Sequence, residues 1–177
     1  PNGCSFPVFE DKSIRSSKQI KLKEQLGLDN NLKYFISIGR FSPEKNMEKI
    51  AEAFTRLNAE NIGLILLGDG ILFPDLKKKY GDKVIFPGFC TNVYDYLIAS
   101  DYYISASDGE GMPNTLLESM TVGLPVVLSD IPSHREVLGK TNKNVGFVFD
   151  QKDVEDILLK MRQILSIDEE AAATELR

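Results

Sequence analysis

The chain contains few of the residues on which several classes of protein depend. Its 177 residues include two cysteines and one histidine, and Cys4 and Cys90 lie far apart without a second pair or a metal-ligand spacing. This pattern predicts neither a disulfide framework nor a zinc site, and it favours a reducing, cytoplasmic compartment. No apolar run approaches the roughly 20 residues that a membrane-spanning helix needs.

Positive charge is also scarce. The chain has 26 acidic and 21 basic residues, hence a net charge of −5, which argues against the basic surface of a general nucleic-acid binder. A nucleotide ligand is still compatible with this balance, because it needs only a local basic pocket. An apolar content of 42% in 177 residues is ordinary for one soluble globular domain with a sizeable core. We therefore expect a single domain over residues 1–177 and no nucleic-acid partner.

Apolar runs and amphipathic segments alternate along the chain. Predicted strands cover 34–38, 62–67, 83–86, 102–106, 125–128 and 146–149, and predicted helices cover 43–57, 72–80, 92–99, 113–122, 133–138 and 153–165. Such alternation predicts an α/β fold with a doubly wound, Rossmann-like parallel sheet of about six strands and helices on both faces. Ser42 and Pro43 are expected to cap and open the first of these helices, and Gly123 to follow the helix 113–122.

The two ends of the chain are expected to lie outside this sheet. We interpret residues 1–30 as an interdomain lead-in segment, 31–166 as the Rossmann-like core, and 167–177 as a truncated, alanine-rich C-terminal helix. The chain begins at Pro1 without a methionine, and its tail ends in the middle of an alanine-rich helical pattern. These features predict a piece of a longer protein.

The most informative phrase holds two glutamates eight positions apart, Glu110 in a glycine-flanked loop and Glu118 on the helix that follows. Pro113 is expected at the first helical position, where its missing N–H is of no consequence. The backbone amides of that first turn form an anion site, and Gly109 and Gly111 let a ligand approach the backbone closely. An anion site with a carboxylate on each side suits a nucleotide sugar, whose phosphates lie between two polyhydroxyl groups.

This phrase resembles the Glu-x7-Glu motif of retaining glycosyltransferases of GT-B architecture, in particular glycosyltransferase family four ("glycosyl transferases group 1"). Further similarity to the family follows in the expected order at 38–46, 66–70, 84–89, 99–101 and 123–127. It extends from about residue 1 to residue 149. The resemblance implies the C-terminal, donor-binding half of such an enzyme.

The resemblance also implies roles for the matching residues. Arg40 and Lys45 would hold the donor diphosphate and offset the charge of the leaving group. Glu118 would accept hydrogen bonds from both ribose hydroxyls, and Glu110, the expected catalytic residue, would contact the donor sugar and stabilise an oxocarbenium-like transition state. A change at Glu110 is therefore expected to leave nucleoside diphosphate affinity nearly unchanged. The other expected donor-binding residues are Gly39, Phe89, Gly111, Met112, Pro113, Asn114, Thr115 and Leu117.

The chain departs from the family pattern at Met112-Pro113-Asn114, where the commoner wording is Phe-Gly. Because Pro113 lacks an amide donor, the sugar would be read by the Asn114 and Thr115 amides and by the Asn114 side chain. The sequence has no Asp-x-Asp pair, so we expect a metal-independent mechanism, with a UDP- or GDP-sugar as substrate and no cofactor.

Three other features have simpler explanations. No nucleophile or catalytic partner lies at a characteristic spacing from His134 in the sequence, so we expect a structural or surface role. Gly68-Asp69-Gly70 fits an ordinary turn as well as a ligand loop. A basic stretch before the first strand predicts a solvated helix face or, alternatively, peripheral contact with an anionic membrane. Its members are Lys12, Arg15, Lys18, Lys21 and Lys23.

The expected function is donor binding in a retaining, metal-independent glycosyltransferase that serves a carbohydrate or lipid-linked acceptor in cell-envelope polysaccharide biosynthesis. Its partner would be an N-terminal acceptor-binding domain of the same polypeptide, and the domain alone would be inactive. A non-catalytic nucleotide or nucleotide-sugar binding module remains the alternative, because fold does not determine function. A dehydrogenase-type domain is disfavoured, since no Gly-x-Gly-x-x-Gly follows the first strand.

Overall fold

The computed structural model describes residues 12–140 and 146–166, with side chains from Arg15 onward. Six parallel strands form one sheet in the order β3-β2-β1-β4-β5-β6. This order is that of a doubly wound, Rossmann-like sheet and confirms the predicted fold class. The strands are β1 (Lys33–Ile38), β2 (Ile62–Leu67), β3 (Ile85–Gly88), β4 (Tyr102–Ser105), β5 (Val126–Ser129) and β6 (Gly146–Phe149).

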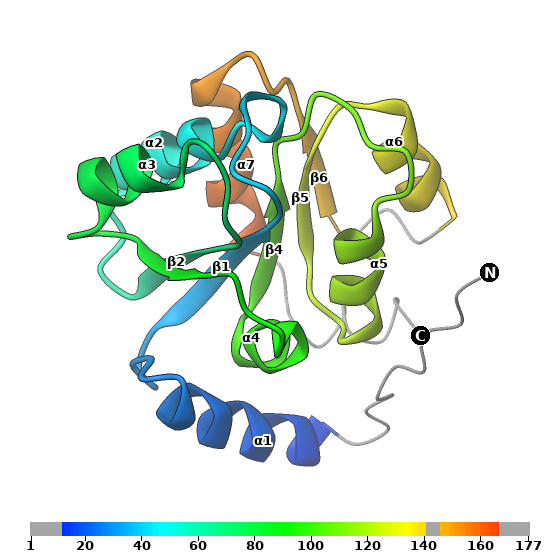
Figure 1. The fold of residues 1–177 in the computed structure, drawn as a ribbon. Helices are drawn as coiled ribbons and strands as arrows, with labels where there is room; N and C mark the ends of the chain where they lie inside the picture. Colours follow the sequence, from blue (N-terminus) through cyan, green and yellow to red (C-terminus); the bar gives the residue numbers. More distant parts are fainter. Residues whose placement is uncertain (1–11, 141–145, 167–177) are drawn as a thin grey trace.

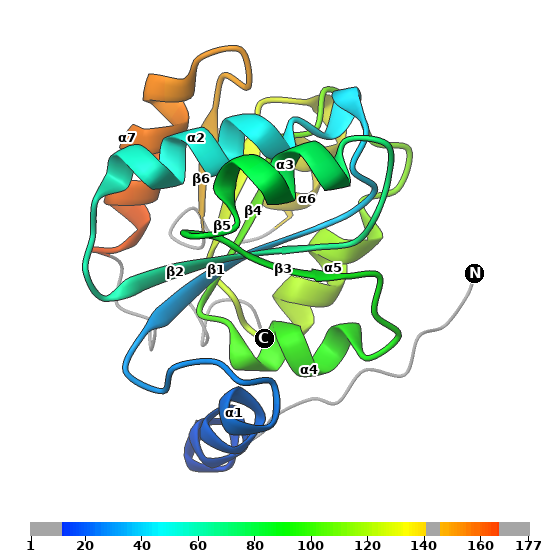
Figure 2. The same ribbon diagram turned by 60° about the vertical axis from the view of Figure 1, so that its left-hand side comes forward.

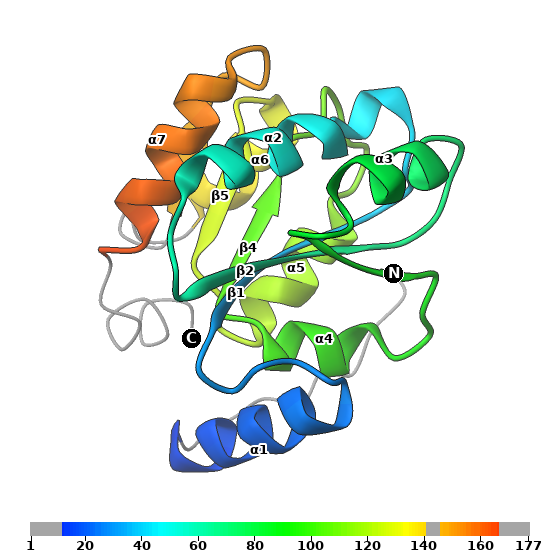
Figure 3. The same cartoon turned by 90° about the vertical axis from the view of Figure 1, so that its left-hand side faces the viewer.

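Helices cover both faces of the sheet. Helices α2, α3 and α7 lie on one face and α4, α5 and α6 on the other, while α1 packs against α4 (Figure 1; Figure 2 and Figure 3 show the same layers from the side). The helices are α1 (Lys12–Gln25), α2 (Met47–Leu57), α3 (Phe73–Tyr80), α4 (Val93–Ala99), α5 (Asn114–Thr121), α6 (Pro132–Gly139) and α7 (Val154–Ile164).

The strands alternate their side chains between two apolar layers. Phe35 and Leu64 enter the layer beneath α2, α3 and α7, whereas Ile36 and Ile65 enter the layer beneath α4 and α5. Because both faces of the sheet are covered, these strands read as continuous apolar runs instead of alternating ones. That is why the sequence predicted their positions closely.

The predicted helix 43–57 is wrong in its first turn. Residues Pro43–Lys45 form a short 3-10 helix, and α2 begins only at Met47. Asn46 separates the two with a left-handed backbone (φ 50°), which few residues other than glycine and asparagine adopt. Ser42 does not cap the helix, because its hydroxyl donates to the Glu44 carboxylate at 2.6 Å.

The expected position of Pro113 is also wrong by one residue. Helix α5 begins at Asn114, and Pro113 precedes it with φ −81° and ψ 68°. This conformation closes a tight turn in which the Asn114 N–H donates to the Met112 carbonyl at 2.9 Å. Gly123 follows the helix with a positive φ of 77°, as its expected place requires.

The basic stretch before β1 is not a uniformly solvated face. Lys23 is 5% exposed and donates to the Leu32 carbonyl at 2.7 Å, because α1 packs this side against α4. Lys18 and Lys21 remain exposed. No helix within 12–140 and 146–166 is long and apolar enough to cross a membrane. Cys4, the residues 1–11 and the predicted helix 167–177 lie outside the described residues.

Candidate active site

Two loops that follow neighbouring parallel strands are bonded into one unit at the carboxyl edge of the sheet. The loop after β1 contains Asn46, whose side-chain amide donates to the Ala106 carbonyl at 3.0 Å and to the Asp108 carboxylate at 2.8 Å. The Asp108 N–H donates to the Glu44 carbonyl at 2.9 Å. These bonds, and not helix propensity, account for the left-handed Asn46 and for the late start of α2.

The two joined loops bring Lys45 and Glu110 into direct contact. The Nζ atom of Lys45 lies 2.5 Å from Oε1 of Glu110. The Ser107 hydroxyl donates to the same oxygen at 2.7 Å. Lys45 and Glu110 are 22% and 19% exposed, so the pair is only partly screened by water. The expected catalytic carboxylate is therefore held by a cation and a hydroxyl.

A cavity of about 270 Å³ opens where β1 and β2 end, and one of its lining residues, Gly39, lies next to the aliphatic stem of Lys45. Gly39, Arg40 and Phe89, three of the predicted donor-binding residues, line it together. Arg40 is exposed, and Phe89 is 78% exposed although it is apolar. The remaining lining residues are Ile38, Leu67, Gly68, Asp69, Cys90 and Val93. The cavity thus combines a cation with an apolar wall, as a nucleotide site requires.

The glycines of the Gly68-Asp69-Gly70 turn are required by the protein's own packing. Gly68 has φ +135°, and a Cβ at this position would lie 2.0 Å from the Gly39 carbonyl oxygen. Gly70 has φ +155°, and its Cβ would lie 2.6 Å from the Phe41 carbonyl oxygen. The turn packs against the loop after β1, which favours the structural interpretation of these two glycines.

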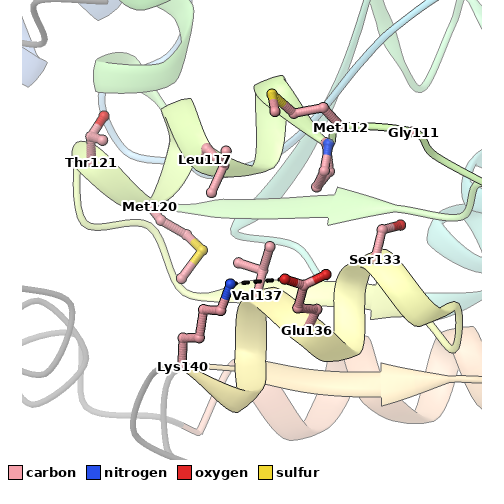
Figure 4. A pocket seen from close by; sticks show the side chains of 10 residues that line it. Gly111, Met112, Leu117, Met120, Thr121, Ser133, Glu136, Val137 and Lys140 are labelled. Carbon is pink, nitrogen blue, oxygen red and sulfur yellow. Dashed lines mark hydrogen bonds and ion pairs between the residues drawn. The ribbon is translucent and has the colours of Figure 1, made fainter. Parts of the chain in front are cut away.

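A second and larger hollow of about 580 Å³ lies between α5 and α6 (Figure 4). Four predicted donor-binding residues line it: Gly111, Met112, Pro113 and Leu117. Its other walls are Met120, Thr121, Ser133, Glu136, Val137 and Lys140. Glu136 and Lys140 form an ion pair of 2.8 Å along one side of the hollow (Figure 4). Seven predicted residues thus line one or the other of two separate hollows, whereas Lys45, Glu110, Asn114, Thr115 and Glu118 line neither.

The N-terminus of α5 is partly occupied by internal hydrogen bonds. The Asn114 amide, predicted to read the sugar, donates to the Met112 carbonyl. The Thr115 hydroxyl shares a hydrogen bond of 2.8 Å with the Tyr103 hydroxyl. Burial raises the pKa of Tyr103 to about 12, so this hydroxyl remains protonated at neutral pH. Thr115 is thus tied to β4 through its side chain.

Glu118 stands one and a half turns into α5 with a carboxylate that no described residue engages. It is half-buried, and within 12–140 and 146–166 neither a hydrogen bond nor an ion pair to its side-chain oxygens is found. Burial raises the pKa of Glu118, because the ionised form loses solvation without gaining a partner. Such a carboxylate is ready to accept hydrogen bonds from a ligand.

The sequence also matches a known protein family. The sequence pattern of the family described as "Glycosyl transferases group 1" matches residues 18–175. The chain belongs to this family of glycosyltransferases. The match includes both glutamates, the loop after β1 and the cavity residues.

Among related proteins, the family member alpha-monoglucosyldiacylglycerol synthase of Streptococcus pneumoniae is 33% identical over 141 residues, 75% of this chain and 32% of the relative. The UDP-Gal:alpha-D-GlcNAc-diphosphoundecaprenol alpha-1,3-galactosyltransferase of Escherichia coli is 29% identical over 168 residues, 89% of this chain and 42% of the relative. The chain therefore spans about a third to two fifths of the length of these curated relatives.

Solved glycosyltransferase structures share the fold. WaaG, a glycosyltransferase involved in lipopolysaccharide biosynthesis, superposes with a TM-score of 0.77 at 21% identity, covering 90% of this chain and 45% of that chain. Anabaena HepE in complex with UDP and glucose gives a TM-score of 0.75 at 23% identity, with the same coverage of 90% and 45%. At these identities the superposition establishes the Rossmann-like fold of this glycosyltransferase-family chain and nothing finer.

Sequence reasoning did not single out several residues of this candidate active site. Ser107 and Asp108 lie within the glutamate phrase, and Asn46 ends the segment that resembles the family's loop after the first strand. Their polar character was visible in the sequence. Their partners were not, because Asn46 and Asp108 are separated by 62 residues and meet only where parallel strands end side by side.

His134 is buried next to the loop that carries Ser107 and Glu110. Its Nδ1 atom lies 3.0 Å from the Ser129 carbonyl oxygen and 3.2 Å from the Ser129 hydroxyl, and that hydroxyl donates to the Ser107 carbonyl at 2.6 Å. Burial lowers the pKa of His134, the Ser129 bond and Glu110 act to raise it, and Lys45 acts to lower it. His134 therefore supports the loop that carries Glu110.

Acidification is expected to destabilise the fold through His134. The pKa of His134 is lowered from its ordinary value of about 6.5, so the unfolded chain takes up this proton before the folded chain does. Stability is then complete above about pH 6.5 and is lost as the pH falls through the folded pKa. His134→Gln should flatten this part of the profile in urea unfolding measured from about pH 8 to about pH 5. An unchanged slope in the variant would assign the effect to other groups.

Proposed function

We propose that this chain is the donor-binding part of a retaining, metal-independent glycosyltransferase that uses a UDP- or GDP-sugar. The contact between Lys45 and Glu110 carries the proposal, together with the position of the Lys45 stem next to Gly39, which lines the cavity with Arg40. In this contact, a lysine that would bind the donor diphosphate touches a carboxylate that would bind the donor sugar. A glycosidic bond to a diphosphate breaks between those two groups.

In this proposal the cations act on the leaving group. Arg40 grips the diphosphate through two parallel hydrogen bonds, and Lys45 adds a point charge that offsets the negative charge released as the bond breaks. These two side chains take over the charge neutralisation that a metal ion provides in other enzymes, and the mechanism needs no cofactor. Within the described residues no group of three or more His, Cys, Asp and Glu side chains is arranged to hold a metal ion.

The carboxylates act at the two ends of the donor. Glu110 stabilises the positive charge that develops at the anomeric carbon, and Glu118 accepts hydrogen bonds from the ribose hydroxyls. Gly109 and Gly111 support this assignment, because a Cβ at either position would meet no atom within 4 Å. The chain's own packing does not require glycine there, so the open space is available to a sugar.

Relatives support the substrate classes. The Escherichia coli relative is named for UDP-Gal and a diphosphoundecaprenol acceptor, and HepE was solved with UDP and glucose. We infer that the acceptor of this protein is a carbohydrate or a lipid-linked sugar of the cell envelope. An N-terminal domain of the same polypeptide would bind it on the cytoplasmic side of the membrane, and the exposed Lys18 and Lys21 would allow peripheral contact with anionic lipid.

Titration calorimetry with UDP, GDP and NAD tests the donor site. We expect this chain to bind UDP or GDP and not NAD, and Arg40→Ala to weaken that binding about tenfold through the loss of charge-assisted hydrogen bonds. Arg56→Ala is the matched control, because Arg56 lies on α2 and pairs with Glu52 and Glu155 away from the cavity.

Two results would contradict the proposal. One is equal affinity for NAD and for the nucleoside diphosphates, and the other is no nucleotide binding at millimolar concentration. Tight UDP or GDP binding without any sugar transfer by a polypeptide that also contains the acceptor half would favour the non-catalytic binding module instead.

A further inference from the structure

The Lys45 side chain reaches from a residue that lines the cavity to Glu110. Its Nζ atom contacts Glu110 Oε1 at 2.5 Å. Its aliphatic stem passes over Gly39, since a Cβ at Gly39 would come within 3.9 Å of Lys45 Cδ and 4.0 Å of Cε. Gly39 lines the cavity that also contains Arg40. Rotation about the end of the lysine stem therefore carries the ammonium from the carboxylate toward an anion in the cavity.

Glu110 keeps a second hydrogen bond when Lys45 moves. The Ser107 hydroxyl donates to Glu110 Oε1 at 2.7 Å, the same oxygen that Lys45 contacts. Ser107 is 2% exposed, and its carbonyl accepts a hydrogen bond from the Ser129 hydroxyl at 2.6 Å. The hydrogen bond from Ser129 of β5 thus keeps Ser107 in position. Ser107 in turn holds the Glu110 carboxylate in place without neutralising its charge.

We propose that Lys45 exchanges partners when a nucleoside diphosphate binds, leaving Glu110 for the phosphate while Ser107 continues to hold the carboxylate. This inference rests on the proposed donor site and concerns how that site is regulated. In the empty site the ion pair neutralises Glu110. Donor binding releases the full negative charge of Glu110 at the time when a sugar has arrived to use it.

This competition predicts the direction in which a change at Glu110 alters nucleoside diphosphate affinity. The ion pair must be broken for the phosphate to gain Lys45, so Glu110 weakens nucleoside diphosphate binding by the strength of the pair. The expectation from sequence, that a change at Glu110 leaves this affinity unchanged, is replaced by an expectation of tighter binding. For a partly buried ion pair we expect a factor of about three to ten.

The test is a double-mutant cycle with UDP as the probe. Glu110→Gln, which preserves shape and removes the charge, is expected to tighten UDP binding about threefold to tenfold in calorimetry. In a Lys45→Gln background the same substitution is expected to change UDP affinity by less than about twofold. If that background binds UDP too weakly for calorimetry, chemical-shift titration at millimolar UDP supplies both dissociation constants. Glu48→Gln is the matched control, because Glu48 forms an exposed ion pair of 2.8 Å with Lys79 and lines neither hollow.

Each outcome decides between explanations. Tighter binding that persists without Lys45 would show simple repulsion between Glu110 and phosphate and would overturn the exchange. Unchanged or weaker binding of UDP by Glu110→Gln would overturn it as well, while leaving the donor site intact. Failure of the unmodified chain to bind UDP or GDP would instead remove the proposed function, and the exchange with it.

Discussion

Replacing Glu118 with alanine is expected to weaken UDP or GDP binding by a factor of about 10 to 100. The half-buried carboxylate has no partner among the described residues, so a ligand would supply its hydrogen-bond donors. Hydrogen bonds to a charged group are worth about 1.5–3 kcal/mol, which corresponds to this range of affinity. Titration calorimetry on the purified chain measures the change directly. Glu52→Ala, on the exposed side of α2, is the control and should leave the affinity unchanged.

A second substitution at Glu118 distinguishes a binding role from a structural one. Burial raises the pKa of Glu118 in the folded chain, so ionisation at neutral pH opposes folding. Glu118→Gln should therefore stabilise the fold near neutral pH, and the gain should disappear as the pH falls below the unfolded pKa of about 4.3. A variant that loses both stability and nucleotide affinity would show that Glu118 is structural. Affinity lost while stability is gained is the pattern expected of a binding residue.

Asp101→Ala is expected to lower the free energy of unfolding by about 3–5 kcal/mol. Asp101 is 8% exposed and accepts hydrogen bonds from the Tyr34 N–H at 2.8 Å and from Gln19 at 2.9 Å. It also lies 3.5 Å from Nζ of Lys23, whose side chain is buried. Removing the carboxylate leaves the Lys23 ammonium buried without its counter-charge and removes a hydrogen bond between Gln19 of α1 and the residue before β4. Urea unfolding followed by circular dichroism gives the difference.

A second aspartate on the surface provides the comparison. Asp130 pairs with Arg135 through an exposed ion pair, and this pair lowers the pKa of Asp130. Asp130→Ala should cost less than about 1 kcal/mol, because exposed ion pairs are screened by water. Equal losses from Asp101→Ala and Asp130→Ala would contradict the view that the cluster around Lys23 anchors α1.

The cluster around Lys23 also shows where sequence reasoning fails. A lysine in a basic helical stretch predicts a solvated side chain, and Lys18 and Lys21 are exposed as expected. Lys23 is buried because the packing of α1 on α4 brings it to Asp101, 78 residues away along the chain. No local pattern contains that contact.

The candidate active site likewise has features that the sequence predicted and features that only the structure revealed. Similarity to the family assigned Arg40, Lys45, Glu110 and Glu118 before any geometry was known, and the chain's membership of that family is confirmed. Their roles remain predictions. The sequence did not indicate that Lys45 and Glu110 touch, nor that seven of the predicted residues would be divided between two separate hollows. The contact follows from the way the loops after β1 and β4 lie against each other.

The sequence by itself determined the class of fold, the six strands and the family of this protein. Strand positions such as Ile62–Leu67 were predicted correctly because a strand buried on both faces must be apolar throughout, and that requirement is local. The tertiary structure alone decided the left-handed Asn46 and the partners of Lys23, Lys45 and Glu110. These features depend on hydrogen bonds and ion pairs between segments that parallel strands bring together, and no pattern along one segment can specify them.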